Sequence, residues 1–409
     1  MLDIKRIRDD FPMLRDAPLM QGHPLVFLDN ASTTFKPGCV LEAMKRYYER
    51  ETANSHRGDY DLCNQADREI AKARDSVARF LNADSKEIVF TSGTTGSLNL
   101  VAYGYGLKFL KPGDEIVLSL AEHASNALPW FRIAKLTGAK IVYAPLNEGH
   151  RITVEAVKSV LTPRTKIVSL AYVGNVLGYL APMKEIAKAV HEAGALLCVD
   201  GAQSTPHIVT DVKDLDCDFL AFSGHKCCGP TGVGVLYGKY QLLCDMDPFE
   251  TGGGMNVKFF PDGTATYLLP PMKFEAGTLP VAEIIGLGAA VEYLMGLGLK
   301  EIEERERHLK AYAVAKLQET GMVDIVNADS EAGVVTFNVK GVFAQDAATY
   351  LNSKGIACRS GQHCAKMLND VLGTPATVRA SFYFYTTEEE IDALADAVKH
   401  GGNFLDAYF

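Results

Sequence analysis

The stretch MKEIAKAVHEAGALLCVDGAQS, residues 183–204, contains the pattern that decides the fold. Its first part, 183–194, places apolar residues at helical spacing and ends in glycine. Its second part, 195–200, is a short apolar run that ends in Asp200. A helix followed directly by a buried strand is typical of an α/β unit, in which helices cover both faces of a mostly parallel sheet. This stretch therefore predicts an α/β fold.

The same alternation extends from about residue 26 to residue 240. Segments of helical length and period, such as 63–82, separate most of the predicted strands. The predicted strands are VFLD (26–29), EIVFT (87–91), EIVLS (115–119), KIVYAP (140–145), KIVSLAYV (166–173), ALLCVD (195–200), FLAFSG (219–224) and GVLYG (234–238). This layout indicates one large domain built around a mostly parallel sheet.

A second, smaller domain is predicted after it. Residues 245–280 are rich in glycine and proline and are expected to form loops, and residues 281–320 are helical in pattern. The runs GVVTFNV, GIACRSG and VRASFYFY then alternate with two more helical segments, which indicates an α+β unit. We predict an N-terminal segment (1–25) packed on the small domain, a large α/β domain (26–280) and a small C-terminal α+β domain (281–409).

The overall composition excludes several classes of function. The 409 residues carry a net charge of −9 with no block of like charges, which argues against nucleic acid and against an anionic membrane as partners. The N-terminus has no apolar signal core, and nine scattered cysteines do not resemble a disulfide scaffold. Without a Cys-x-x-Cys or His-x-x-x-His pair, we expect no metal site. The expected location is the cytoplasm.

Polar residues with chemical potential follow the predicted strands. Ligands of open α/β sheets bind at the carboxyl ends of the strands, so these residues would share one edge. Segment 92–100 brackets Thr94 and Thr95 between glycines at a helix start, where backbone N–H groups can hold a phosphate. The other residues at strand ends are His123, Asn175, Asp200, Gln203, Ser223, His225 and Lys226.

Each of these residues alone also has an ordinary structural interpretation. Asp200 could cap a turn, His123 could be a core histidine and Lys226 could be a solvated loop lysine. Together they supply what pyridoxal 5′-phosphate (PLP) requires: a lysine for the Schiff base, an acid beside the pyridine nitrogen and anchors for the phosphate. A buried lysine also loses its proton readily and becomes a competent amine nucleophile. The sequence therefore predicts a PLP site.

The order of the motifs resembles a known family. DGAQ, then SGHK, then GPTGVGVLYG are similar to the fold-type I PLP enzymes of the class V aminotransferase family. Within it, FLDNASTT, NSHRG (54–58), GTTGSLN, FEAGT (274–278) and RSGQHCA resemble the cysteine desulfurases, and the short RxGxHCA form resembles the second, SUF-type group. The resemblance covers roughly residues 1–400 and implies a large domain with a mostly parallel seven-stranded sheet plus a smaller α+β domain.

The resemblance implies a role for each residue around the cofactor. Lys226 would form the Schiff base and move protons on the substrate carbon. Asp200 would pair with the pyridinium nitrogen, Gln203 would bond the ring hydroxyl, and His123 would stack on the ring and act as an acid–base group. The expected phosphate ligands are Thr94, Thr95, Ser223 and His225, joined by Thr278 from the neighbouring subunit of a homodimer.

The resemblance also implies the substrate groups and the reaction. Asn175 and Arg379 would bind the carboxylate of L-cysteine, with Arg359 as a further active-site residue. The product would be L-alanine, with a persulfide left on Cys364 and passed to a SUF-type acceptor protein for iron–sulfur cluster assembly. Selenocysteine lyase, cysteine sulfinate desulfinase, another enzyme of the same fold and a catalytically silent scaffold are the alternatives. Relatives usually have histidine at the position of Gln362 and many have glutamate at that of Gly96.

Cys364 by itself would decide nothing. It could be core filler, a metal ligand, half of a disulfide or a nucleophile. The loop RSGQHCA follows a predicted strand of the second domain and can fold over the cleft at the strand ends of the first, which favours a nucleophile. A working thiolate needs nearby positive charge or a base, because an unperturbed thiol has a pKa of about 8.5. Adjacent His363 is expected to point away, so Arg359, His123 or the substrate complex is the better candidate.

Overall fold

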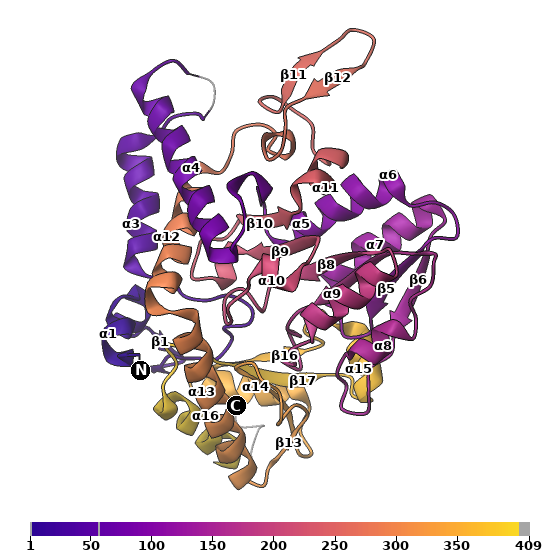
Figure 1. The fold of residues 1–409 in the computed structure, drawn as a ribbon. Coiled ribbons are helices and arrows are strands. Elements are labelled where there is room, and N and C mark those ends of the chain that lie inside the picture. Colours follow the sequence, from indigo (N-terminus) through magenta and orange to yellow (C-terminus); the bar gives the residue numbers. More distant parts are fainter. Residues whose placement is uncertain (1, 56–57, 401–409) are drawn as a thin grey trace.

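A seven-stranded sheet forms the centre of the large domain in the computed structural model, which describes residues 2–55 and 58–400 (Figure 1). The strand order is β4-β10-β9-β8-β7-β5-β6. β10 runs antiparallel to both of its neighbours, and the other neighbouring pairs are parallel. The bounds are β4 (Ile88–Thr91), β5 (Glu115–Ser119), β6 (Lys140–Ala144), β7 (Thr165–Ala171), β8 (Leu196–Asp200), β9 (Phe219–Ser223) and β10 (Gly234–Gly238). This confirms the predicted fold class.

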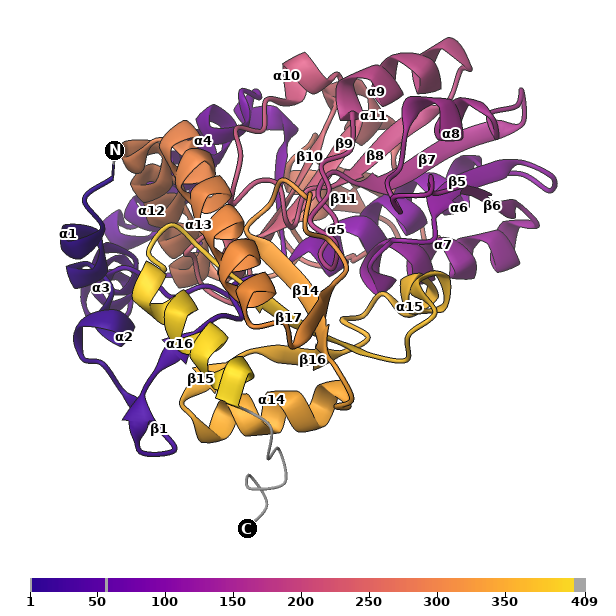
Figure 2. The ribbon, with the colours of Figure 1, turned by 90° about the horizontal axis from the view of Figure 1, so that it is seen from below.

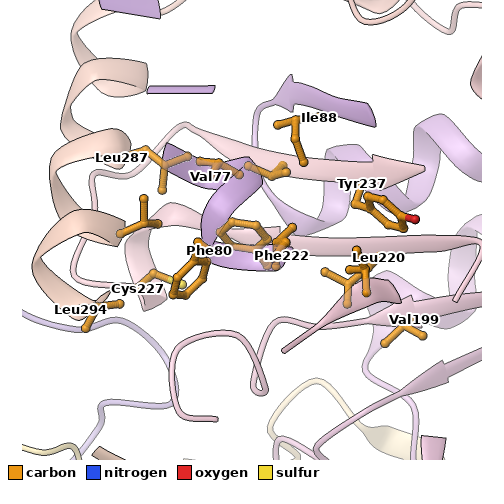
Figure 3. Close-up of a cluster of buried hydrophobic side chains, with 14 of the residues drawn as sticks. Val77, Phe80, Ile88, Val199, Leu220, Phe222, Cys227, Tyr237, Leu287 and Leu294 are labelled. Atoms are coloured by element: carbon orange, nitrogen blue, oxygen red, sulfur yellow. The ribbon is translucent and has the colours of Figure 1, made fainter. Parts of the chain in front are cut away.

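Side chains alternate along the strands between two apolar cores, one on each face of the sheet. Leu220 and Phe222 of β9 enter the core that contains Phe80 of α4 (Figure 3), whereas Phe219 enters the core that contains Trp130 of α7. Alternation with both faces buried is what an α/β sheet requires. The helices of this part are α3 (Gly38–Arg46), α4 (Asp61–Leu81), α5 (Thr94–Val101), α6 (Leu107–Phe109), α7 (Ala124–Thr137), α8 (Val154–Lys158), α9 (Met183–Glu192), α10 (Val212–Leu215) and α11 (Tyr240–Asp245).

Short helical turns complete this part. Residues Tyr47–Glu51 and Ala102–Gly106 form π-helical turns, and the segments Ser85–Glu87, Gly224–Lys226 and Met272–Phe274 form 3₁₀ turns. The turn after β9 is the one that carries Lys226 to the strand end.

Two expectations about local structure are wrong. The run VFLD forms only the short β3 (Val26–Phe27), which pairs in parallel with β15 (Ile356–Ala357) and not with the large sheet. Residues 245–280 are not all loop, because β11 (Asn256–Phe259) and β12 (Ala265–Tyr267) form an antiparallel hairpin. The hairpin stands out from the body of the protein (Figure 1) and is largely exposed, so no buried face imposes an apolar period on its sequence.

A four-stranded antiparallel sheet forms the C-terminal part, with the order β13-β14-β17-β16 (Figure 2). Its strands are β13 (Val323–Ile325), β14 (Val334–Val339), β16 (Arg359–Gly361) and β17 (Thr377–Ser381). The helices here are α13 (Leu299–Glu319), α14 (Ala344–Ser353), α15 (Lys366–Leu372) and α16 (Glu388–His400). Leu309, Val335 and Leu394 belong to one buried cluster, which joins this sheet to α13 and α16.

Helix α12 (Val281–Leu297) packs against α3 and α4 rather than on the small sheet (Figure 1). It meets α13 at a bend of 75° near Gly298. The division into domains stays a prediction, and this packing favours a boundary nearer Gly298 than residue 280. In the described chain no single helix is long and apolar enough to span a membrane, although α12 and α13 together pass that test as a bent pair.

The N-terminal segment contacts the C-terminal part. It comprises α1 (Ile4–Asp9), α2 (Pro12–Arg15), β1 (Leu19–Met20) and β2 (His23–Pro24). Arg8 Nη1 donates to the carbonyl of Tyr385 at 2.7 Å, and its guanidinium pairs with Glu390 at 3.0 Å. Phe11 packs on the ring of Tyr385 with 4.9 Å between centroids. In the NSHRG motif, His56 and Arg57 lie outside the described residues.

Candidate active site

A cavity of about 240 Å³ opens at the carboxyl ends of the large sheet, against the small sheet. Twelve of the thirteen predicted site residues line it, and Thr278 does not. They are Thr94, Thr95, His123, Asn175, Asp200, Gln203, Ser223, His225, Lys226, Arg359, Cys364 and Arg379. The structure therefore brings the predicted set together, and the roles assigned to its members stay predictions.

Lys226 lies in the turn Gly224–Lys226 that follows β9. Its Nζ makes no hydrogen bond and no ion pair with any residue in the described ranges. Burial lowers the pKa of this amine to about 8, although the carboxylate of Asp200 acts in the opposite direction. A substantial fraction of Lys226 is therefore neutral near pH 7 to 8, the form in which an amine attacks a carbonyl carbon.

Asp200 and Gln203 occupy the end of β8 and the turn after it. Asp200 Oδ1 accepts from the backbone N–H of Ala202 at 3.0 Å, and burial raises the pKa of the carboxyl while that hydrogen bond and Lys226 lower it. Gln203 is buried and donates to the carbonyl of Ala31 at 2.7 Å, which fixes the plane of its amide. A buried carboxylate with few donors favours a cationic partner such as a pyridinium.

The start of α5 and the end of β9 form one polar corner. The backbone N–H of Thr94 donates to Ser223 Oγ at 2.8 Å, the two hydroxyls lie 2.7 Å apart, and Thr95 Oγ1 lies 2.8 Å from Ser125 Oγ. Gly93 turns the chain into the helix with a φ of 139°, which a residue with a side chain rarely adopts. Hydroxyls and a helix N-terminus in one corner suit a phosphate.

His123 is the N-cap of α7. Its Nδ1 accepts from the backbone N–H of Ser125 at 3.1 Å, so the neutral ring carries its proton on Nε2. Burial, together with the positive charges of Lys226, Arg359 and Arg379, lowers the pKa of His123 to about 4. The imidazole is therefore neutral at pH 7 and can accept or return a proton only through a group placed in the cavity.

A buried carboxyl group holds the segment that carries His123. Glu122 accepts from Ser119 Oγ at 2.6 Å, from Asn126 Nδ2 at 2.7 Å and from the backbone N–H of Ala171 at 2.9 Å. Burial raises its pKa to about 7 against these three donors. The contacts tie together the ends of β5 and β7 and the first turn of α7. Our sequence analysis missed Glu122, whose only signal is its place beside His123 after a strand.

The two predicted arginines lie side by side on the small sheet. Arg379 of β17 donates through Nη1 to the carbonyl of Asn175 at 2.9 Å and through Nη2 to Asp29 Oδ1 at 3.1 Å. Both Arg379 and Arg359 donate to Ser32 Oγ, at 2.8 and 2.9 Å. Sequence analysis did not identify Ser32, although it belongs to the quoted FLDNASTT motif.

Cys364 lies at the edge of the cavity with an exposed side chain. Its loop is attached to the large domain twice: Ala124 N–H donates to the carbonyl of Cys364, and Asn175 Nδ2 donates to the carbonyl of His363, both at 2.8 Å. His363 and Cys364 have φ angles of 49° and 58°, in the left-handed region that favours glycine. The loop is therefore held in one uncommon conformation that presents the thiol.

His363 is not the base beside the thiol. Its ring is buried, and Nε2 lies 2.9 Å from Thr377 Oγ1 and 3.1 Å from the carbonyl of Thr377. Burial lowers the pKa of His363 to about 3, with Arg379 as the next cause. The prediction that the two neighbouring side chains point apart is confirmed. The positive charge near Cys364 comes from Arg359 and Arg379, which line the same cavity.

Thr278 is exposed on a loop outside its own cavity. Glu275, three residues before Thr278, anchors this loop through a buried ion pair with Arg74. The two guanidinium Nη atoms of Arg74 donate to the two carboxylate oxygens of Glu275, each at 2.8 Å. Glu275 Oε1 also accepts from the backbone N–H of Phe90 at 2.8 Å, and the Arg74 guanidinium lies 4.5 Å from the ring centroid of Phe90. A second cavity, of about 570 Å³, opens beside Thr94, Thr95 and His225.

The donor set fits PLP. The cavity joins an amine that has no hydrogen-bond partner among the described residues, a buried carboxylate and a hydroxyl-lined helix start. These are the three groups that the cofactor needs. Lys226 would hold it covalently, Asp200 would face its ring nitrogen, and Thr94, Thr95, Ser223 and His225 would hold its phosphate. When bound, PLP supplies an electron sink at the substrate carbon.

Comparisons with known proteins agree with this site. Residues 26–394 match the sequence model of the family Aminotransferase class-V. The chain is 46% identical to a probable cysteine desulfurase of Halalkalibacterium halodurans over 97% of this chain and 98% of that one. Its fold is similar to that of the cysteine desulfurase CsdA from Escherichia coli (TM-score 0.90, 40% identity, 97% and 98% of the two chains covered).

An apo structure of the cysteine desulfurase from Thermococcus onnurineus NA1 has a TM-score of 0.91 and 37% identity, with 98% of each chain covered. These matches span nearly the full length of both partners and are far above the level at which only the fold is shared. The chain therefore belongs to the class-V aminotransferase family of PLP-dependent, fold-type I enzymes, among the cysteine desulfurases.

Proposed function

We propose that this protein converts L-cysteine to L-alanine and retains the sulfur as a persulfide on Cys364. The observation that carries the proposal is the presence of the exposed Cys364 thiol and the partner-free Lys226 amine in one cavity. A nucleophilic thiol and an amine that line one cavity suit a reaction in which sulfur leaves a substrate held by its amino group.

The bond changes balance without an external oxidant. The Cys364 thiolate attacks the substrate sulfur, so a sulfur–sulfur bond forms while the carbon–sulfur bond breaks. The electron pair of the broken bond stays with the β-carbon, which takes a proton and becomes the methyl group of alanine. His123, neutral because its pKa is about 4, and Lys226, with a pKa of about 8, are the groups that move protons between these atoms.

The carboxylate of the substrate would bind between Arg379 and Asn175. Arg379 has a fixed guanidinium whose Nε is buried and has no hydrogen-bond partner within residues 2–55 and 58–400. A planar guanidinium is suited to a two-point contact with a carboxylate. Arg359 is the second cation that lines this cavity, and it would place a further positive charge on the side where Cys364 lies.

We further propose a homodimer in which Thr278 of one subunit reaches the phosphate corner of the other. Thr278 is exposed and does not line its own cavity, while the second cavity beside Thr94, Thr95 and His225 offers room for a chain from outside. The persulfide would pass to a SUF-type acceptor protein in the cytoplasm, for iron–sulfur cluster assembly. The resemblance of the RSGQHCA loop to the SUF-type form supports that destination.

One assay tests the function. Purified protein reconstituted with PLP is given L-cysteine and a thiol reductant, and L-alanine and sulfide are measured in parallel, with selenocysteine and cysteine sulfinate as comparison substrates. We expect equal amounts of alanine and sulfide from L-cysteine, with faster release when an acceptor protein is added. Turnover of selenocysteine or cysteine sulfinate with no turnover of L-cysteine would refute the proposal.

A further inference from the structure

The loop of residues 174–178, named here the bracket loop, is bonded to the small domain through four of its five carbonyl groups. Its carbonyl groups from Asn175 to Gly178 each accept one hydrogen bond from a residue of the C-terminal part. The donors, in the order of the carbonyls, are Arg379 Nη1 (2.9 Å), Thr336 Oγ1 (2.5 Å), Asn327 Nδ2 (2.8 Å) and the backbone N–H of Ala332 (3.1 Å). Four consecutive carbonyls paired in this way leave the loop little freedom to shift.

The register of the small sheet explains why the donors reach the loop together. Thr336 of β14 is directly opposite Arg379 of β17, and Arg379 is directly opposite Arg359 of β16. Residues opposite each other in antiparallel strands project from the same face. The three side chains therefore form one row, in which Thr336 contacts the bracket loop, Arg379 contacts both loop and cavity, and Arg359 faces the cavity.

Asn327 bonds both to the bracket loop and to the strand that carries Thr336. Its Oδ1 accepts from the backbone N–H of Thr336 at 2.8 Å, while its Nδ2 donates to the carbonyls of Leu177 and Val334 at 2.8 and 2.9 Å. Asn327 and Thr336 are both completely buried, so water cannot replace a bond that is lost.

The close fit extends to Gly178. It has a φ of 67°, and an added Cβ would lie 3.3 Å from both Ser330 Oγ and Ala332 Cβ. The small domain therefore approaches this end of the bracket loop at van der Waals distance.

The bracket loop is also the part of the large domain that meets the Cys364 loop. Asn175 Nδ2 donates to the carbonyl of His363 at 2.8 Å. Val176 and Leu177 form a small buried cluster with Ala365 and Leu368, which follow Cys364 in the chain. One short loop thus carries a predicted carboxylate ligand on one side and supports the nucleophile loop on the other.

We propose that Thr336 is a positioning residue of substrate binding, which acts through the carbonyl of Val176 to align Asn175 with Arg379 and with the Cys364 loop. The inference rests on the proposed function for the roles of Asn175 and Cys364. The small domain holds the bracket loop in place, and the loop in turn sets the position of Asn175 in the carboxylate site.

The test uses the holoenzyme with Thr336→Val, which keeps the shape of the side chain and removes the donor. Thr336→Ser restores a hydroxyl. Thr165→Val is the matched control, because Thr165 is also completely buried and its hydroxyl donates to Glu115 at 3.3 Å while it accepts from Thr162 N–H. Thr165 lies at the amino end of β7, away from the cavity. An unsatisfied buried carbonyl changes an equilibrium about tenfold. We expect Thr336→Val to raise KM for L-cysteine about tenfold with a smaller change in kcat, and Thr336→Ser to recover most of the loss.

A second measurement does not depend on activity. Hydrogen–deuterium exchange should become faster in Thr336→Val at residues 172–181 and 359–368 together, and should stay unchanged there in Thr165→Val. If Thr336→Val does not fold, Asn327→Ala serves for the same measurement. Unchanged exchange in both segments, or a KM equal to that of Thr165→Val, would overturn the proposal. Suppose that exchange is faster in Thr336→Val at both segments but the wild-type protein does not desulfurate L-cysteine. That result would refute the proposed function and would still support the role of Thr336 in holding the bracket loop.

Discussion

Arg359 and Arg379 lie directly opposite each other on β16 and β17, and both donate to the single hydroxyl of Ser32. Asp29 pairs with Arg379 at 3.1 Å and is the one carboxylate in an ion pair with either cation among the described residues. Two cations that share so little negative charge leave a positive wall on the cavity. Such a wall favours an anionic substrate.

Arg379→Lys should weaken substrate binding more than catalysis. Lysine keeps the charge but cannot make the two-point contact, and it leaves the carbonyl of Asn175 without its donor. We expect KM for L-cysteine to rise about tenfold or more, since hydrogen bonds to charged groups contribute about 1.5 to 3 kcal/mol. Steady-state kinetics checks this. Arg305→Lys, which changes an arginine that binds the carbonyl of Thr386, is the control and should leave KM unchanged.

Cys364→Ser should keep the yellow colour of the bound cofactor and lose nearly all turnover of L-cysteine. Serine cannot accept sulfur as a persulfide. Cys358 is the internal control, because it lies six residues earlier and burial raises the pKa of its thiol far above the usual range. Alanine release and persulfide mass spectrometry on both variants distinguish the two thiols. Near-normal desulfuration by Cys364→Ser would indicate a lyase that does not use this residue.

The attachment of PLP to Lys226 should depend on pH with a midpoint near 8, not near the ordinary lysine value of 10.5. Burial lowers the pKa of the amine, so the neutral, attacking form accumulates as the pH rises through 8. The rate of absorbance change after mixing apoprotein with PLP measures this pH dependence.

Borohydride reduction should fix the cofactor to a peptide that contains Lys226, and Lys226→Ala should lose the covalent link. Labelling of a different lysine would show that the assignment is wrong.

Mixed dimers test the crossing of Thr278. In a heterodimer of Lys226→Ala and Thr278→Ala chains, one site would carry both defects and the other would carry neither. We expect each parent to be impaired and the mixture to recover part of the activity. Failure to recover, with heterodimers demonstrated by mass spectrometry, would count against the crossing.

The sequence predicted most of the cavity because parallel strands end at one edge. His123, Asp200 and Lys226 follow three different strands, and once the α/β alternation is recognised their convergence follows. Ser32 could also have been found, since it lies in a motif that had already been recognised. The pattern could not give the row from Thr336 to Arg359, because that row depends on the register between strands far apart in the chain.

The alternation of apolar and polar residues also failed to predict strands where no apolar face is buried. The hairpin of β11 and β12 exposes Val257 and Phe259, so apolar residues there do not mark an inside. The course of the Cys364 loop was expected only in outline. Its two consecutive left-handed residues are not glycines, and no pattern in the sequence announces them.

The backbone conformation at Cys364 lowers the stability of the folded protein at the position of the proposed nucleophile. A residue with a side chain costs roughly 1 to 2 kcal/mol in the left-handed region, and glycine avoids that cost. With a φ of 58°, position 364 would make the folded protein more stable if it held glycine. An evolution experiment that selected only for heat resistance would therefore tend to exchange this cysteine for glycine. If the proposed mechanism holds, the more stable protein would no longer carry sulfur. Any effort to stabilise the enzyme has to hold this residue fixed.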